Sequence, residues 1–219
     1  MTPKPTELRM DGRGIKKLVP TDESSPDRFE AVRYSAEVVP ASNANGATVS
    51  GRLLAAMPAA VMKTSGSFEE YTWEILAEAG ARPIDEHDWY AQETALAVLA
   101  HLQDVVGEQV VERVGRFLPE LLEWPRDVTT FTEALEAVDD WYRAVHRDDD
   151  ATVTFTTTGP STGELRLATP YPTGFENGLV RGLVLQFSTD GTYVWTTSAR
   201  DTDGETVYRF VIRTVAGEA

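Results

Sequence analysis

Three histidines are the side chains of this chain best suited to acid–base or metal chemistry, because the chain contains no cysteine. The absence of cysteine excludes disulfides, thiolate metal sites and cysteine nucleophiles. The phosphate-binding loop Gly-x-x-x-x-Gly-Lys, the zinc motif His-Glu-x-x-His and the nucleophile motif Gly-x-Ser-x-Gly are also absent. A Ser-His-Asp triad can assemble from distant positions, but nothing in the sequence supports one. We therefore expect a protein that is not an enzyme.

Each histidine has a structural interpretation beside a chemical one. His87 lies in the acidic loop Asp85-Glu-His-Asp88, where a metal could bind, although a solvated loop is the simpler interpretation. His101 falls just outside the apolar face of its predicted helix, as expected of a boundary side chain that makes a hydrogen bond. His146 ends another predicted helix, where a cation interacts favourably with the helix dipole. Asp139 lies on the same flank, so Asp139 and His146 form a structural polar pair, are exposed to solvent, or line part of a pocket.

Apolar residues at helical spacing predict the helices that position these side chains. The predicted helices cover Val49–Met62, Phe68–Ala79, Ala91–Val106, Glu108–Leu122 and Phe131–His146. Leu99 and Val105 belong to the predicted inward face of the third helix, and Val138 and Tyr142 to that of the last. Trp73 lies off the apolar stripe of its helix, so it either packs on a neighbouring helix or marks an interface.

After residue 150 the apolar period changes from helical to alternating, which indicates strands. Two hairpins are predicted, pairing Thr152–Thr157 with Glu164–Ala168 and Thr192–Ser198 with Val207–Arg213. Between the hairpins lie three glycines at spacings of four, which puts them on one face of a helix; they are Gly174, Gly178 and Gly182. Either backbone packs very closely on this bare face, or the face admits a ligand.

The net charge of −15 argues against nucleic acid and against anionic membrane surfaces as partners. Four lysines stand against sixteen arginines, and the acidic residues are spread along the chain, which is typical of proteins from salt-loving archaea. No apolar run reaches the roughly 18–20 residues of a membrane span and no signal-peptide pattern opens the chain, so we expect a cytoplasmic protein. Residues 1–46 are predicted to be a weakly structured N-terminal arm, and residues 47–216 a single α+β domain.

Four segments carry a resemblance to a known superfamily; they are Gly51–Ala56, Phe68–Gly80, Val110–Leu118 and Gly178–Leu183. The first three resemble helices of heme nitric-oxide/oxygen-binding (H-NOX) domains. The fourth resembles the glycine-rich helix shared with vinyl-reductase-type small-molecule-binding domains. The order of elements, helices and then helix–hairpin–helix–hairpin, resembles the superfamily that unites these two groups with TRAPP vesicle-transport subunits.

The resemblance also identifies what this chain lacks. It places Asp139 where an H-NOX domain has its heme-ligating histidine. The Tyr-x-Ser-x-Arg motif that holds the heme propionates would fall at Ala168, Pro170 and Pro172, and none of the three matches. The cysteines of the vinyl-reductase-type domains are missing as well. The resemblance therefore implies a domain without heme, metal or another cofactor.

We predict an α+β fold in which an N-terminal helical layer is followed by helix–β-hairpin–helix–β-hairpin with a four-stranded antiparallel sheet. The predicted function is a heme-free sensory or small-molecule-binding domain, with a pocket between the helical part and the sheet. The candidate pocket residues are Leu99, His101, Val138, Asp139, Tyr142 and His146. The expected ligand is an apolar small molecule, and a homodimer is left open. The alternative is a protein–protein interaction module, a dimerisation or adaptor unit with a filled core.

Overall fold

A computed structural model describes residues 6–10, 16–20, 46–64, 69–124, 128–188, 192–200 and 205–214. The chain divides into two compact units, Met1–Val38 and Val39–Ala219. In the first unit, strands β1 (Thr6–Met10) and β2 (Lys16–Pro20) form an antiparallel hairpin. The sequence pattern predicts no strands there, and most of the predicted arm 1–46 lies outside the described residues.

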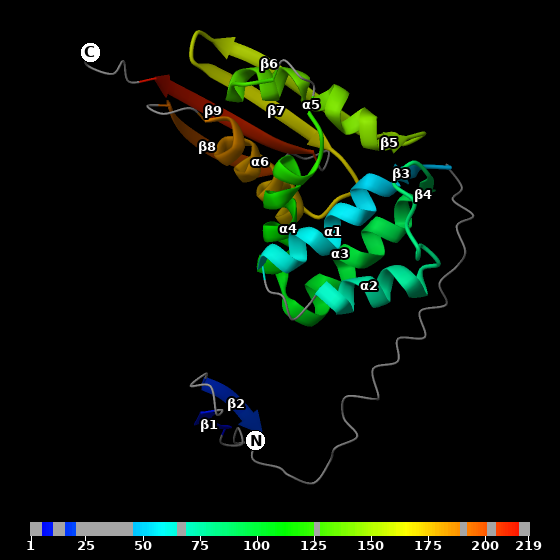
Figure 1. Cartoon of the computed structure of the whole chain (residues 1–219). Coiled ribbons are helices and arrows are strands. Elements are labelled where there is room, and N and C mark those ends of the chain that lie inside the picture. Colours follow the sequence, from blue (N-terminus) through cyan, green and yellow to red (C-terminus); the bar gives the residue numbers. More distant parts are fainter. Residues whose placement is uncertain are drawn as a thin grey trace. The chain divides into compact units, whose positions relative to one another are not determined.

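The N-terminal half of the second unit is helical, as the apolar stripes predict (Figure 1). Its helices are α1 (Gly51–Thr64), α2 (Glu69–Glu78), α3 (Gln92–Val106) and α4 (Glu108–Leu121). Helix α1 continues through Pro58, and α4 continues through Pro119. On α3 the predicted inward face is wrong at Val105, which is 53% exposed. Trp73 on α2 is half-buried against the core, with the guanidinium of Arg82 over its ring.

Helix α5 (Phe131–Val145) shows the closest agreement between sequence and structure. Thr130 caps it in a capping box with Glu133, since each side chain bonds the other residue's backbone N–H. All seven residues of the predicted apolar stripe are buried: Phe131, Ala134, Leu135, Val138, Trp141, Tyr142 and Val145. The helix ends one residue before the predicted position, because His146 is already extended and pairs as strand β5 (His146–Arg147).

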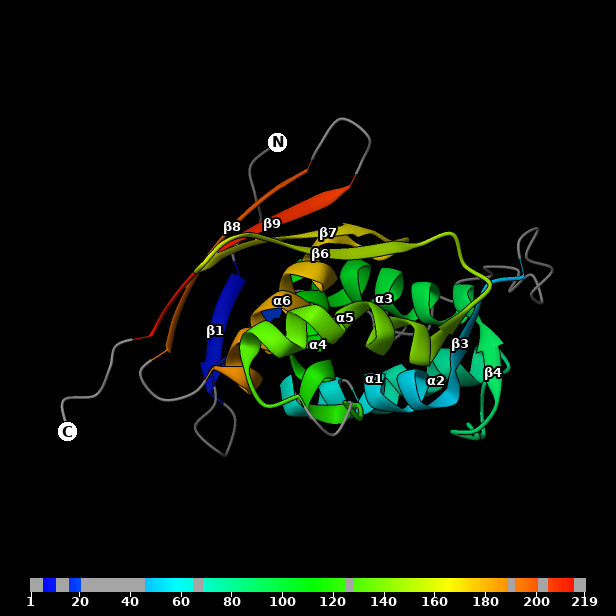
Figure 2. The same cartoon turned by 90° about the horizontal axis from the view of Figure 1, so that it is seen from above.

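The predicted four-stranded antiparallel sheet is confirmed, with strand order β6-β7-β9-β8. Its strands are β6 (Thr152–Gly159), β7 (Thr162–Ala168), β8 (Thr192–Arg200) and β9 (Thr206–Thr214). Helix α6 (Thr173–Phe187) joins the two hairpins. Helices α5 and α6 lie on the same face of this sheet (Figure 2), where Phe131 packs edge-on against Phe210 and the Tyr208 hydroxyl donates to Asn177.

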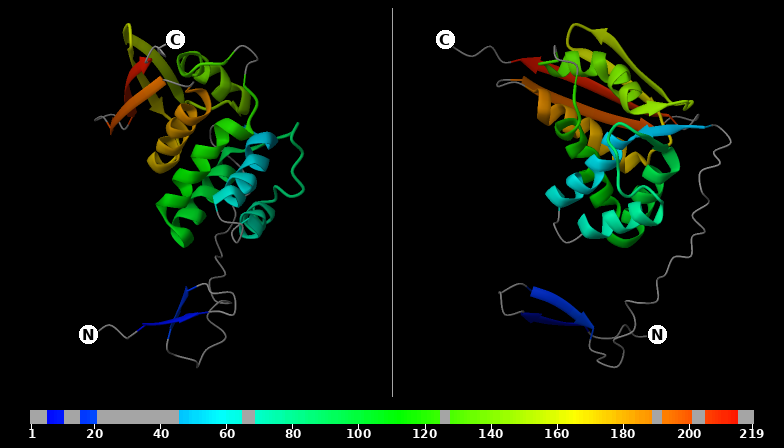
Figure 3. Two further views of the ribbon diagram at one scale, coloured as in Figure 1. Left: turned by 60° about the vertical axis from the view of Figure 1, so that its left-hand side comes forward. Right: turned by 45° about the vertical axis from the view of Figure 1, so that its right-hand side comes forward.

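The glycines of α6 let its backbone touch the backbone of α4. A Cβ atom at Gly178 would overlap the carbonyl oxygen of Glu112, and one at Gly182 would overlap that of Arg116. Gly115 of α4 meets the carbonyl of Phe175 in the same way. Of the two explanations for the bare glycine face, close backbone packing is therefore the one the structure supports. Helices α4 and α6 consequently lie between the sheet and helices α1 to α3 (Figure 3).

A second sheet of very short strands, absent from the sequence prediction, closes the other end of the domain. Strand β3 (Thr48–Ser50) lies between β4 (Trp89–Ala91) and β5, antiparallel to both. Gly51 starts α1 directly after β3, and its N–H donates to the carbonyl of Asp88. This small sheet fixes the residues that follow α5 against the start of α1.

Candidate functional site

A narrow cavity lies where the helices meet the four-stranded sheet. Helices α1 and α4 contribute Leu53 and Leu118 to its wall. The remaining lining residues come from α5, strand β5, the four-stranded sheet, the β7–α6 loop and α6: Val138, Trp141, Tyr142, Val145, His146, Val153, Leu167, Thr169, Tyr171, Phe175, Glu176 and Leu179. The cavity volume is about 20 Å³ and its wall is apolar. That volume accommodates one or two water-sized groups.

His146 lies at the polar end of the cavity wall, held by three contacts. Its Nδ1 is 2.9 Å from the carbonyl oxygen of Tyr142, one helical turn earlier. A carbonyl can only accept, so Nδ1 carries the proton and Nε2 is the acceptor. The Tyr171 hydroxyl donates to Nε2 at 2.7 Å. The imidazole also stacks on the Tyr142 ring, with centroids 3.8 Å apart and planes within 5°.

Burial keeps this imidazole neutral. Desolvation lowers the pKa of His146 to about 4, against small opposing effects of the Tyr142 carbonyl and the Asp149 charge. Burial likewise raises the pKa of the Tyr142 and Tyr171 hydroxyls far above that of free tyrosine. All three rings therefore remain uncharged over the physiological pH range.

The polar contacts continue from the cavity toward the surface. The Tyr142 hydroxyl donates to Asp149 Oδ2 at 2.6 Å, and the side-chain amide of Gln92 donates to the same oxygen at 3.2 Å. Asp149 is half-buried, whereas Gln92 is buried at the start of α3. The network thus ties the end of α5 to α3, with its charge at the outer end.

A second polar group, the carboxyl of Glu176, belongs to the first turn of α6. Glu176 is 4% exposed, and Thr169 donates a hydrogen bond to its Oε1 at 2.7 Å. Thr169 Oγ1 in turn accepts from the backbone N–H of Tyr171. Burial raises the pKa of the Glu176 carboxyl, opposed by hydrogen bonds from Thr206 and Thr169. The polar atoms of this corner are therefore bonded to one another rather than directed into the cavity.

Trp141 is the lining residue whose polar atom has no such partner. Its ring stacks on Trp124, with centroids 4.8 Å apart and planes within 6°. Its indole N–H is buried and meets no acceptor among the residues that the structure describes, which leave out 125–127 next to Trp124. A buried donor of this kind commonly bonds to water or to a ligand.

The structure brings together three of the six predicted pocket residues. Val138, Tyr142 and His146 line the cavity. Leu99 is fully buried in the core but is not a lining residue. His101 bonds through Nε2 to the Tyr71 hydroxyl, on the α2 side of the helical layer. Asp139 forms an ion pair with Arg143 on the outer side of α5, so it does not share the wall with His146.

Sequence reasoning missed Tyr171, Thr169 and Glu176. The only local signal for Tyr171 is its position between Pro170 and Pro172. The third histidine, His87, is exposed and pairs with Asp85 as a solvated loop would. Within the described residues, no group of three or more acidic or histidine side chains is placed to hold a metal ion. Nor does any described helix have the length and apolar character needed to cross a membrane.

A helical layer packed on a sheet-plus-helix layer is an α+β arrangement that can be compared with known folds. No protein-family model and no curated protein sequence matches the chain. Solved structures do match it. An H-NOX protein from S. oneidensis in the Fe(II) ligation state, a triple mutant, is 15% identical with a TM-score of 0.59, covering 78% of this chain and 99% of that one.

Two further structures place the fold in the same group. The H-NOX domain from Shewanella oneidensis in the Fe(II)CO state is 15% identical with a TM-score of 0.55, covering 75% of this chain and 98% of that one. An oxygen-binding H-NOX domain related to soluble guanylate cyclases is 12% identical with a TM-score of 0.53, covering 76% of this chain and 95% of that one. The H-NOX part of the resemblance is thereby confirmed for the fold. The relation to vinyl-reductase-type domains and TRAPP subunits, and the origin in a salt-loving archaeon, stay predictions.

Proposed function

We propose that this chain is a non-enzymatic, heme-free sensory domain of the H-NOX fold, which binds a small apolar molecule in the cavity between its helical layer and its sheet. The observation that carries the proposal is the cavity itself. It lies inside the domain, its wall is apolar, and its polar lining groups other than the Trp141 N–H are bonded within the protein. Apolar pockets with few polar groups are the usual form of small-molecule sites.

The residues of the cavity do not fit heme. A volume of about 20 Å³ is far too small for a tetrapyrrole. Asp139, at the position where the family has its iron ligand, pairs with Arg143 outside the cavity. His146 is the histidine that lines the wall, and its Nε2 lone pair is already used by the Tyr171 hydroxyl. The lining residues also include no arginine or lysine that could hold a propionate.

The size and character of the cavity define the ligand class. A wall of aliphatic side chains favours an uncharged apolar molecule over an ion, because a charge buried there would have no partner. The volume admits a molecule of very few heavy atoms without rearrangement. The net charge of −15 also supports a cytoplasmic domain that acts without nucleic acid or a membrane surface.

Xenon is a suitable probe, because dry apolar cavities of proteins take it up. Under xenon pressure, ¹³C-methyl NMR of the full chain should show saturable shifts at Leu53, Val138 and Leu179, which line the cavity. Val138→Ile adds a methylene to the wall and should abolish the shifts. Val111→Ile is the matched control, since Val111 is fully buried but not a lining residue. Absence of shifts in the unmodified protein, or shifts that persist in Val138→Ile, would contradict the proposal.

The second candidate is the interaction module with a filled core, and the small cavity volume favours it. In that case the same xenon experiment gives no cavity-specific shifts, and the domain works through its surface alone. The two candidates therefore predict opposite results in one measurement.

A further inference from the structure

The outer face of the four-stranded sheet, opposite α5 and α6, carries a distinctive set of side chains. Register places Thr162, Val211 and Trp195 in one row across β7, β9 and β8. The next row contains Glu164, Arg209 and Thr197. The row after that contains Arg166, Val207 and Ala199. Thr156 and Thr154 continue the second and third rows onto β6, and Val207 of the third row is buried. We call these rows, together with Glu205 and Arg213 at their two ends, the outer sheet face.

Large apolar groups are exposed on this face. Trp195 is 52% exposed and Val211 is 39% exposed, although they are direct neighbours on paired strands. The guanidinium of Arg213 lies 5.4 Å from the centre of the Trp195 ring. Exposed tryptophan beside arginine is the composition found at the centre of protein interfaces.

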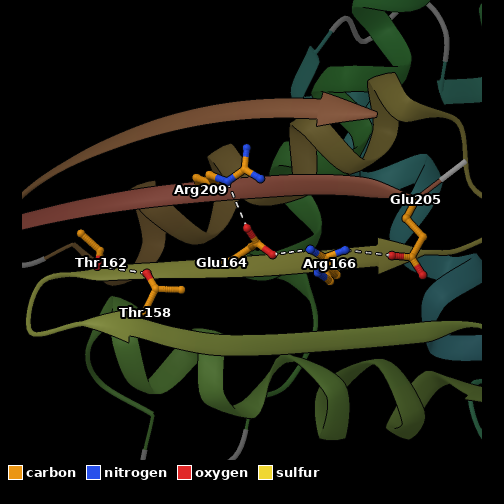
Figure 4. Close-up of polar contacts among 6 residues, drawn as sticks. All are labelled: Thr158, Thr162, Glu164, Arg166, Glu205 and Arg209. Atoms are coloured by element: carbon orange, nitrogen blue, oxygen red, sulfur yellow. Dashed lines mark hydrogen bonds and ion pairs between the residues drawn. The ribbon is translucent and has the colours of Figure 1, made fainter. Parts of the chain in front are cut away.

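The charged groups of the face are held in a fixed arrangement. Arg209 Nε donates to Glu164 at 3.0 Å, and Arg166 contacts both Glu164 and Glu205, as Figure 4 shows. The Glu164 side chain is only 18% exposed beneath the two arginines. Thr158 and Thr162 are joined by a hydroxyl–hydroxyl bond at the turn of the same hairpin. Because these side chains are already ordered, less side-chain entropy is lost when a partner binds.

The outer sheet face is close to neutral, whereas the chain as a whole is strongly acidic. Its described side chains include three arginines, at 166, 209 and 213, and two glutamates, at 164 and 205, whereas the whole chain has a net charge of −15. Because each chain has a net charge of −15, two copies repel each other on average. Two copies that meet through this face place near-neutral surfaces with both signs of charge against each other.

We propose that the outer sheet face is the contact between two copies of this chain in a symmetric dimer. The same patch then serves on both copies, so Trp195 and Val211 of one copy are buried against the same patch of the other. The proposal does not depend on the cavity being occupied.

The area of the face predicts a weak dimer. Four strands at about 4.8 Å spacing and about seven residues at about 3.3 Å give roughly 440 Å² on each copy. The total of roughly 900 Å² lies in the range of weak, transient interfaces. Association should therefore be weak and concentration-dependent. It should strengthen with salt, which screens the repulsion between two acidic bodies.

Sedimentation equilibrium of the full chain, at several concentrations in low and in molar potassium chloride, tests the proposal. We expect a reversible monomer–dimer equilibrium that shifts toward dimer at high salt. Trp195→Glu should weaken association at least tenfold. Leu185→Glu is the matched control, because Leu185 is an exposed residue (61%) on α6, and this variant should dimerise normally. Far-UV circular dichroism verifies that both variants are folded.

Either of two results would overturn the proposal. The first is a chain that stays monomeric at every concentration and salt level, in which case the face is covered by another protein or another part of the chain. The second is a dimer that Trp195→Glu leaves intact, or that Leu185→Glu disrupts equally, which would place the interface elsewhere.

Discussion

Replacing Gly178 by alanine is a sharp test of how the glycine-rich helix is packed. Alanine in a helix interior is ordinarily about 1 kcal/mol more favourable than glycine. Here the added Cβ would overlap the backbone carbonyl of Glu112, so α4 and α6 must separate. Overpacking costs about 1–3 kcal/mol, and the upper end applies because the obstacle is backbone. The net expectation is a loss of about 1–2 kcal/mol in the free energy of unfolding.

The same helix contains a matched control. A Cβ at Gly174 would meet mainly the flexible side chain of Glu108, at 3.0 Å from its Cγ, rather than backbone. Gly174→Ala should therefore be close to neutral, whereas Gly178→Ala should lower the melting temperature by about 2–8 °C. Urea and thermal unfolding followed by circular dichroism measure both. If Gly178→Ala stabilises the protein, as helix propensity alone predicts, then the described contact between α4 and α6 is incorrect.

Three other predictions concern the buried ring cluster and the acidic surface. Between pH 6.5 and about 4 the unfolded chain protonates His146 while the folded chain does not, so the free energy of unfolding should fall by about 1.4 kcal/mol per pH unit as pH decreases. His146→Gln should remove this pH dependence of the free energy of unfolding, whereas His87→Gln, at an exposed histidine, should leave it unchanged. Equal pH dependence in the two variants would refute the prediction. Tyr171→Phe leaves the Nε2 acceptor of His146 without its donor and should cost about 1–3 kcal/mol in urea unfolding; a neutral substitution would mean that this bond is not formed. With a net charge of −15, the melting temperature should rise as potassium chloride increases into the molar range, and a flat or falling curve would contradict this.

Much of the fold follows from local patterns. The apolar stripe of α5 predicts every one of its buried residues, because a helix between solvent and a core has one apolar face. The four-stranded sheet follows from alternation and turn residues. The three-stranded sheet does not, since strands of two or three residues are too short to show a period.

The site is less readable than the fold, because it depends on residues that meet only in the folded chain. The position of His146 at the end of α5 is visible in the sequence, but its partner Tyr171 lies 25 residues away in an irregular loop. Asp139 and His146 are seven residues apart, a spacing that predicts one shared flank of a helix. They separate because the chain leaves the helix at His146, so the helical spacing no longer applies there. The neutral state of the imidazole likewise depends on burial, which only the fold determines.

Hemin titration of the purified full chain tests the central claim most directly. The account predicts no saturable Soret band, because the cavity is too small and His146 Nε2 is bonded to Tyr171. Residual absorbance should be the same in a His146→Ala variant. Stoichiometric hemin binding with a sharp Soret band, lost on changing His146, would contradict the account and make this chain a heme protein.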